Sequence, residues 1–153
     1  MTDILFKAKR LDNGEWIECG SIVQFMDDGV RSVFIPDRSR PCNCLHDEYT
    51  DNIESCSDFF LVKVDPETVC QYTGMTDKNG VDIFDGDKVK VCLDPEIKNG
   101  VVRFNEEIAC FCIDFDDGFV TFLDFVIARK KVREKVWIEV IGNIYDKEDN
   151  NAQ

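Results

Sequence analysis

Residues 77–93 read DKNGVDIFDGDKVKVCL, and this stretch decides the fold. Two glycine-containing turn signals, at 77–80 and 85–87, enclose a short apolar run, because Asn-Gly and Asp-Gly pairs adopt the positive φ angles that tight turns need. From residue 88 to residue 93 apolar and polar side chains alternate, which is the two-residue period of a strand with one buried face. The stretch therefore predicts short antiparallel strands joined by tight turns.

The same pattern continues in both directions along the chain. Further turn signals occur at 12–14, 27–29, 99–100 and 116–118. The runs between them have strand length: 4–8, 16–19, 21–25, 30–35, 59–64, 69–73, 101–104, 108–115, 119–125 and 136–145. Asp65 and Pro66 predict one helical turn, as its cap and its first residue. Only 124–135 has the length of a longer helix, and its Val, Ile and charge content favours that helix weakly.

These elements predict a mainly β fold in two parts. Residues 1–64 form an N-terminal antiparallel β-meander with an irregular insertion at 38–58, and residues 65–150 form a second β unit, a sandwich or a small barrel. The runs 108–115 and 119–125 are apolar on both faces, as expected for strands that are covered on both sides. The expected barrel core is Ile83, Val89, Val101, Phe104, Ile141 and Ile144. Residues 151–153 are expected to be a disordered tail.

Charge restricts the classes of partner. The chain has 153 residues, a net charge of −13 and a single histidine. Nucleic acids and anionic membranes are bound by clusters of Lys and Arg, so we expect neither direct nucleic-acid binding nor membrane binding. No apolar run is long enough for a signal peptide or a membrane span, which predicts a cytoplasmic protein. Its eight cysteines are then expected to be reduced.

Five short motifs, taken in their order along the sequence, resemble those of a known protein family. PETVCQYTG at 66–74 runs into DKNG at 77–80 and IFDGDKV at 83–89, followed by GVVRF at 100–104 and VIGNIY at 140–145. In this order the motifs resemble those of the YopX family, whose members occur in bacteriophages, prophages and related mobile elements. The opening, with Ile4, Phe6 to Ala8 and Trp16, is similar to that family's first hairpin. Asp85, where the family usually has Glu, and the cysteine-containing stretch 38–58 depart from the pattern.

The resemblance implies an all-β protein whose C-terminal part is an SH3-like barrel, and it implies no particular activity. The motif residues that match are Gln71, Tyr72, Thr73, Gly74, Asp77, Gly80, Gly86, Asp87, Gly142 and Asn143. The conformational and hydrogen-bonding needs of turns explain why Gly and Asp occur at these positions, without any catalytic role. Gly fits where a turn needs positive φ or a close backbone approach, and Asp accepts backbone N–H bonds within its own turn.

Zinc is the sharpest chemical alternative. Cys42, Cys44, His46 and Cys56 are residue types that bind zinc, and the first three would share one face of an extended segment. The single residue between Cys42 and Cys44 is shorter than the two to four that zinc knuckles use, so a loop with incidental thiols is the simpler interpretation. We therefore expect no cofactor.

Other clusters have ordinary explanations. Cys110 and Cys112 lie two apart in a strand and are expected in the core or an interface, because a redox pair uses two intervening residues. The carboxylates at 82, 85 and 87 and at 114, 116 and 117 lack the ligand order of an EF-hand. The only basic cluster, at 129–131 with Arg133 and Lys135, indicates a solvated face or a weak nucleic-acid contact.

No nucleophile, phosphate-binding or dinucleotide motif is present, so the sequence predicts a protein that is not an enzyme. We expect a phage or mobile-element accessory protein that binds an unidentified protein partner, with a homo-oligomer left open. One alternative is an acidic DNA mimic that inhibits a host nucleic-acid enzyme by presenting carboxylates where phosphates would lie. The other is a zinc-binding protein that uses Cys42, Cys44, His46 and Cys56.

Overall fold

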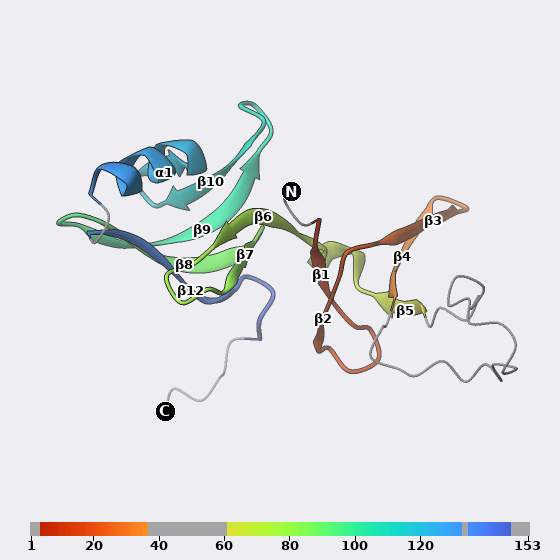
Figure 1. Ribbon diagram of the computed structural model, residues 1–153. Coiled ribbons are helices and arrows are strands. Elements are labelled where there is room, and N and C mark those ends of the chain that lie inside the picture. The colour runs from red at the N-terminus through yellow and green to blue at the C-terminus, as the bar shows by residue number, and fades with distance from the viewer. Residues whose placement is uncertain (1–3, 37–60, 133–134, 148–153) are drawn as a thin grey trace, which may run out of the picture. The chain divides into compact units, whose positions relative to one another are not determined.

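The computed structural model describes residues 4–36, 61–132 and 135–147 (Figure 1). Their secondary structure is almost entirely antiparallel β, as the alternating sequence predicts, with one short 3₁₀ turn and one α-helix. Residue contacts divide the chain into two compact units between Val69 and Cys70, five residues after the boundary expected from sequence. We call them the N-terminal unit and the C-terminal unit.

The N-terminal unit consists of two hairpins and one further strand. Its strands are β1 (Phe6–Lys9), β2 (Trp16–Cys19), β3 (Val23–Asp27), β4 (Val30–Pro36) and β5 (Leu61–Val64), followed by the 3₁₀ turn η2 (Pro66–Thr68). β1 pairs with β2, while β3, β4 and β5 form a separate sheet in that order. The expected continuous meander is thus divided into two sheets. β4 pairs with β5, which is distant in sequence and which local turn signals cannot reveal.

Local chemistry accounts for the turns of this unit. Asp28 and Gly29 both have positive φ, 45° and 80°, which is the type I′ geometry that suits a two-residue hairpin. Asp65 caps η2 by accepting a hydrogen bond from the Glu67 backbone N–H at 3.1 Å, as predicted. The buried side chains of Ala8, Cys19, Val33, Ile35 and Val64 form one core. The N-terminal unit therefore has a small core of its own.

The C-terminal unit contains seven strands and the helix. They are β6 (Cys70–Thr76), β7 (Asp82–Phe84), β8 (Asp87–Leu93), β9 (Ile97–Asn105), β10 (Cys110–Phe115), β11 (Gly118–Thr121), α1 (Phe122–Lys131) and β12 (Val136–Asn143). Five strands form one antiparallel sheet in the order β11-β10-β9-β8-β12, and β6 pairs with β7. The structure thus shows the mainly β class, while the SH3-like barrel that the resemblance implies stays a prediction.

One side of the five-stranded sheet carries the core of this unit. Val89 and Val91 face it from β8, Val102 from β9 and Ile113 from β10, and all four are fully buried. Phe122 and Phe125 from α1 pack against the same cluster, and Figure 1 shows the helix lying near β10. The apolar content of β10 is therefore explained by a sheet face that is covered by a helix.

Two expected core residues lie elsewhere. Phe104 and Ile141 are exposed, whereas Ile83 and Val89 are buried as expected. Phe104 lies near the end of β9, next to Phe111 on β10, with the ring centroids 5.3 Å apart. Ile141 is the extra residue at the register irregularity of β12 between Val140 and Gly142, and it does not share the inward side of the strand with the buried Val136 and Ile138.

The turn predicted at 99–100 is wrong. Gly100 lies inside β9, paired with Val89, and the chain reverses before β9 instead. A Cβ atom at Gly100 would lie 2.7 Å from the Asp114 carbonyl oxygen and 2.8 Å from Ile113 Cγ2. Glycine is required here because another strand approaches closely, which is the second of the two uses that the sequence left open.

The strand predicted over 119–125 is also wrong beyond Thr121. Thr121 Oγ1 accepts a hydrogen bond from the Asp124 backbone N–H at 3.0 Å, which caps the N-terminus of α1. Phe122 and Phe125 are then three residues apart on one helical face and both are buried. The cap and this spacing favour a helix over the β propensity of the Phe and Val residues.

Candidate functional site

The family motif residues are spread over four turns or strand ends of the C-terminal unit. Asp77 is buried at the first of them. Its Oδ1 atom accepts hydrogen bonds from the backbone N–H groups of Asn79, at 2.7 Å, and Val81, at 2.9 Å. Its Oδ2 atom accepts a third from the Val140 N–H, at 3.1 Å. One carboxylate thus closes the 77–81 turn and attaches it to the edge of β12.

These bonds also determine the ionisation of Asp77. Burial by itself would raise the pKa of its carboxyl group, but the three backbone N–H groups outweigh burial and hold the pKa below its usual value. The Lys78 backbone N–H adds a hydrogen bond to the Ile138 carbonyl oxygen, at 2.9 Å. Gly80, with φ at 82°, completes the turn. The DKNG motif therefore folds into a turn that is hydrogen-bonded to the edge strand β12.

Asp87 and Asn143 form a second, deeper connection. Asp87 is fully buried at the start of β8, and its Oδ2 atom accepts a hydrogen bond from the Phe84 backbone N–H at 2.8 Å. Asn143 Nδ2 donates to Asp87 Oδ1 at 2.9 Å. The Asn143 Oδ1 atom accepts from the Tyr145 backbone N–H, also at 2.9 Å. The DGD and IGN motifs are thus joined by a buried hydrogen bond.

Glycine is needed beside this pair. Gly86 has φ at 82°, and a Cβ atom there would approach the Ile144 side chain to 3.3 Å. The backbone of Gly86 donates to the Val102 carbonyl oxygen at 2.8 Å and accepts from the Ile144 N–H at 3.0 Å. Gly142 has φ at 154° at the register irregularity of β12. Gly86 thus allows close packing against Ile144 and Asn143, while Gly142 supplies a backbone conformation that favours glycine.

The remaining motif residues pair β6 with β7. The Thr73 hydroxyl donates to the Ile83 carbonyl oxygen at 2.8 Å, and the Tyr72 ring packs on Phe84 with the centroids 5.7 Å apart. Gln71 accepts the Asp85 backbone N–H through its carbonyl oxygen at 2.9 Å. Gly74, with φ at 83°, lies where the pairing of β6 and β7 shifts register. All ten motif residues thus have places in turns or strand pairings.

The two strand cysteines lie together. Cys112 is fully buried and Cys110 is partly exposed, with their sulfur atoms 4.0 Å apart. Burial, with the Cys110 thiol beside it, raises the pKa of Cys112 to about 11. A reactive cysteine needs a lowered pKa, because the thiolate is the nucleophile. The structure therefore favours the packing interpretation over redox chemistry.

The zinc candidates Cys42, Cys44, His46 and Cys56 lie outside the described residues. Within residues 4–36, 61–132 and 135–147, no group of three or more His, Cys, Asp and Glu side chains is arranged to hold a metal ion. Of the clustered carboxylates, Asp117 accepts a hydrogen bond from Lys98 Nζ at 2.7 Å. Burial raises the pKa of Asp85, whose Oδ1 accepts the Phe104 backbone N–H at 3.2 Å.

The basic cluster is divided by the structure. Arg129, Lys130 and Lys131 form the last turn of α1, while Arg133 lies outside the described residues. Lys135 Nζ lies 3.3 Å from Asp94 Oδ2. Three of the five side chains therefore share one end of a helix.

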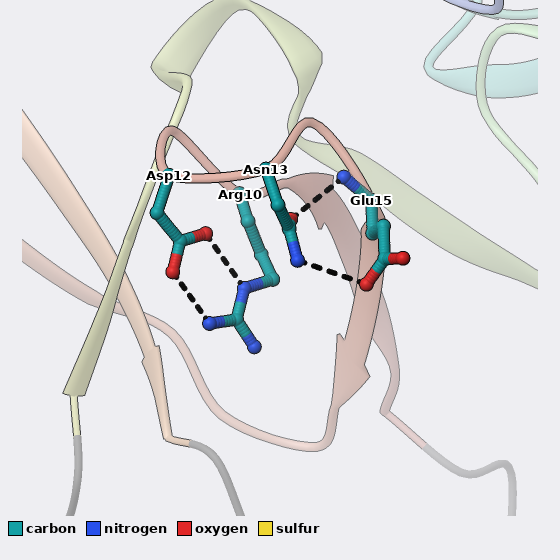
Figure 2. Close-up of polar contacts among 4 residues, drawn as sticks. All are labelled: Arg10, Asp12, Asn13 and Glu15. Carbon is teal, nitrogen blue, oxygen red and sulfur yellow. Dashed lines mark hydrogen bonds and ion pairs between the residues drawn. The ribbon is translucent and has the colours of Figure 1, made fainter.

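In the N-terminal unit, a polar cluster occupies the turn between β1 and β2 (Figure 2). Arg10 makes a two-pronged contact with Asp12, from Nε at 2.9 Å and from Nη2 at 2.6 Å. Asn13 bridges to Glu15 through both its side chain and the Glu15 backbone N–H, each at 2.9 Å. The cluster joins neighbouring residues of one exposed turn, so it serves the hairpin.

Comparison with known proteins agrees with the motif. The family model described as YopX protein matches residues 5–149. The chain belongs to the YopX family. A search of curated proteins gave no match. The match covers nearly all of the chain, so the YopX assignment includes both units. In the C-terminal unit, the YopX motifs contain the buried Asp77 and Asp87, whose hydrogen bonds are described above.

One surface was missed by sequence reasoning. Leu123 and Ile127, on successive turns of α1, are 68% and 43% exposed. Their four-residue spacing is the only signal that could have revealed them, and it is readable only once the helix is known to begin at Phe122. No helix among the described residues is long and apolar enough to cross a membrane.

Proposed function

We propose that this YopX protein is a non-enzymatic accessory protein that binds another protein through its C-terminal unit. The observation that carries the proposal is a set of large apolar side chains left exposed on that unit. They include Phe104, Ile108, Phe119, Leu123 and Ile127. Large apolar side chains left in water are surfaces that a protein partner can cover.

The polar side chains of the same unit support this proposal. The carboxylates of Asp77 and Asp87 are engaged by backbone N–H groups or by Asn143 within the fold. Among the described residues, every buried side-chain nitrogen or oxygen atom has a hydrogen-bond partner. A catalytic site normally presents polar groups toward a substrate cavity, whereas these groups face one another. The phage or mobile-element setting is part of the proposal and rests on family membership.

The test is affinity capture with the full chain at low and at high salt, followed by reconstitution of each captured protein as a purified complex. We expect a stoichiometric complex that survives high salt, because apolar contacts are not screened. An unrelated acidic protein of similar size is the control. If no captured protein reconstitutes with the purified chain, the proposal is wrong.

Two other outcomes would replace it. A nucleic-acid enzyme that binds only at low salt, and is inhibited, would indicate the DNA mimic. Stoichiometric zinc in the purified chain, lost when Cys42 and Cys44 are replaced by Ser, would indicate the metal-binding alternative.

A further inference from the structure

The helix α1 is attached to the sheet by one face and leaves the other uncovered. Phe122 and Phe125 are buried in the core cluster, and Ala128 packs against it. At 3.6 residues per turn, the opposite side of the helix carries Leu123, Ile127, Lys130 and Lys131, all of them exposed. We call these four residues the outward face of α1. It combines an apolar half at the start of the helix with a basic half at its end.

Neither lysine of the basic half forms an ion pair with a described residue. Within the described part of the chain, no carboxylate lies within ion-pair distance of Lys130 or Lys131, whereas Lys78, Lys98 and Lys135 each contact one. The whole chain carries 31 acidic and 18 basic residues, so two adjacent lysines beside exposed apolar side chains make a locally basic site on an acidic chain. The outward face therefore differs in charge from its surroundings.

Helix stability accounts for only half of this face. Basic residues in the last turn interact favourably with the helix dipole, which explains Lys130 and Lys131 without any partner. The dipole does not explain Leu123 and Ile127, whose apolar surface is left in water at a cost of about 25 cal/mol per Å². A bound partner would cover the apolar side chains and pair with the two lysines on one continuous face.

We propose that the outward face of α1 docks a protein segment that carries acidic side chains beside apolar ones. The proposal rests on the proposed function and deepens it, because it names the surface and the chemistry of the partner. Acidic side chains would pair with Lys130 and Lys131, and apolar side chains would cover Leu123 and Ile127. Charge complementarity determines the choice of occupant.

Other occupants fit this face less well. Nucleic acid would use the two lysines but gain little from Leu123 and Ile127, and its continuous run of phosphates would be repelled by a chain of net charge −13 far more than a segment with a few carboxylates. An anionic membrane would meet the same repulsion, and α1, the one α-helix among the described residues, is short. A second copy of the chain would bring a net charge of −13 toward another −13. Each of these occupants is a measurable outcome of the test.

The test is selection from a random displayed peptide library with the immobilised full-length chain. Two variants alter the outward face, Leu123→Gln with Ile127→Gln and Lys130→Gln with Lys131→Gln, because Gln preserves helix propensity. Two matched controls change the same residue types elsewhere on the C-terminal unit: Ile97→Thr with Ile141→Thr, and Lys88→Gln with Lys90→Gln. Circular dichroism and thermal midpoints establish that each variant is folded.

We expect enriched peptides that contain Asp or Glu together with Leu, Ile or Phe. Each outward-face variant should weaken their binding about tenfold or more, and the controls about twofold or less. No enrichment, enrichment without acidic residues, or equal binding by outward-face and control variants would overturn the inference. So would preferential binding of a single-stranded oligonucleotide, of phosphatidylserine vesicles or of a second copy.

The result is separable from that of the proposed function. A reconstituted protein partner that binds the outward-face variants as tightly as the unmodified chain would refute docking on α1 and leave the accessory function intact. Failure of every captured partner to reconstitute would refute the accessory function itself.

Discussion

Asn143 Nδ2 donates a hydrogen bond of 2.9 Å to Asp87 Oδ1, and this bond connects the end of β12 to the start of β8, 56 residues earlier. Both side chains are buried. Asp87 also accepts the Phe84 N–H, so a single carboxylate holds the turn before β8 and the strand beside it. Two motifs of the YopX pattern, at 83–89 and at 140–145, thus meet at one hydrogen bond.

Replacing Asn143 by Ala removes a donor from a buried carboxylate. A hydrogen bond to a charged group contributes about 1.5–3 kcal/mol, so we expect the free energy of unfolding to fall by about that amount. Urea denaturation of the full chain measures it. The control is Gln71→Ala, whose exposed side chain should matter by less than about 0.5 kcal/mol. An Asn143 variant as stable as that control would show that the bond is energetically minor.

The ionisation of Asp77 should make the free energy of unfolding depend on pH. Its folded pKa is lowered by three backbone N–H groups, so its stabilisation is present above the unfolded pKa of about 3.9 and is lost as pH falls through the folded value. We expect unfolding midpoints measured from pH 6 downward to decline on the acid side. In Asp77→Asn, which cannot ionise, this component of the decline should be absent. An identical pH profile for both proteins would contradict the assignment.

Gly100→Ala places a methyl group 2.7 Å from the Asp114 carbonyl oxygen. Because that oxygen belongs to the backbone of β10, it cannot rotate away, and we expect a loss of about 1–3 kcal/mol in the free energy of unfolding. Asn99→Ala, on the exposed face of the same strand, is the matched control. Hydrogen exchange of the β9 and β10 amides would detect the local loosening. Unchanged exchange would mean that the strands separate at no cost.

Arg10 and Asp12 provide a test in the N-terminal unit. The hydrogen bonds from the Arg10 guanidinium lower the pKa of Asp12 to about 2 (Figure 2). NMR titration of the Asp12 carboxyl carbon should give that value in the full chain. Arg10→Gln should return the pKa toward 3.8. Because Asp12 is exposed, little change in overall stability is expected. A normal pKa in the unmodified chain would show that the contact does not persist in solution.

Much of the fold could be predicted from the sequence, for reasons that are local. The turns at 27–29, 77–80 and 85–87 depend on glycine and on carboxylates that bond within a few residues, and the strands at 16–19 and 88–93 follow from alternation. The family could be recognised for the same reason, because most of its motifs contain residues that form turns. None of this required knowledge of what lies across the fold.

Tertiary structure alone decided the rest. Gly100 looks like a turn residue until β10 is placed beside it, and 122–125 looks like a strand until Thr121 caps a helix whose phenylalanines fill a core built from five strands. The partners of Asp77 and Asp87, at Val140 and Asn143, are more than fifty residues away. The outward face of α1 exists only because Phe122 and Phe125 are buried. Long-range packing determines which side of an element meets water, and a single sequence records only the local preferences that packing can override.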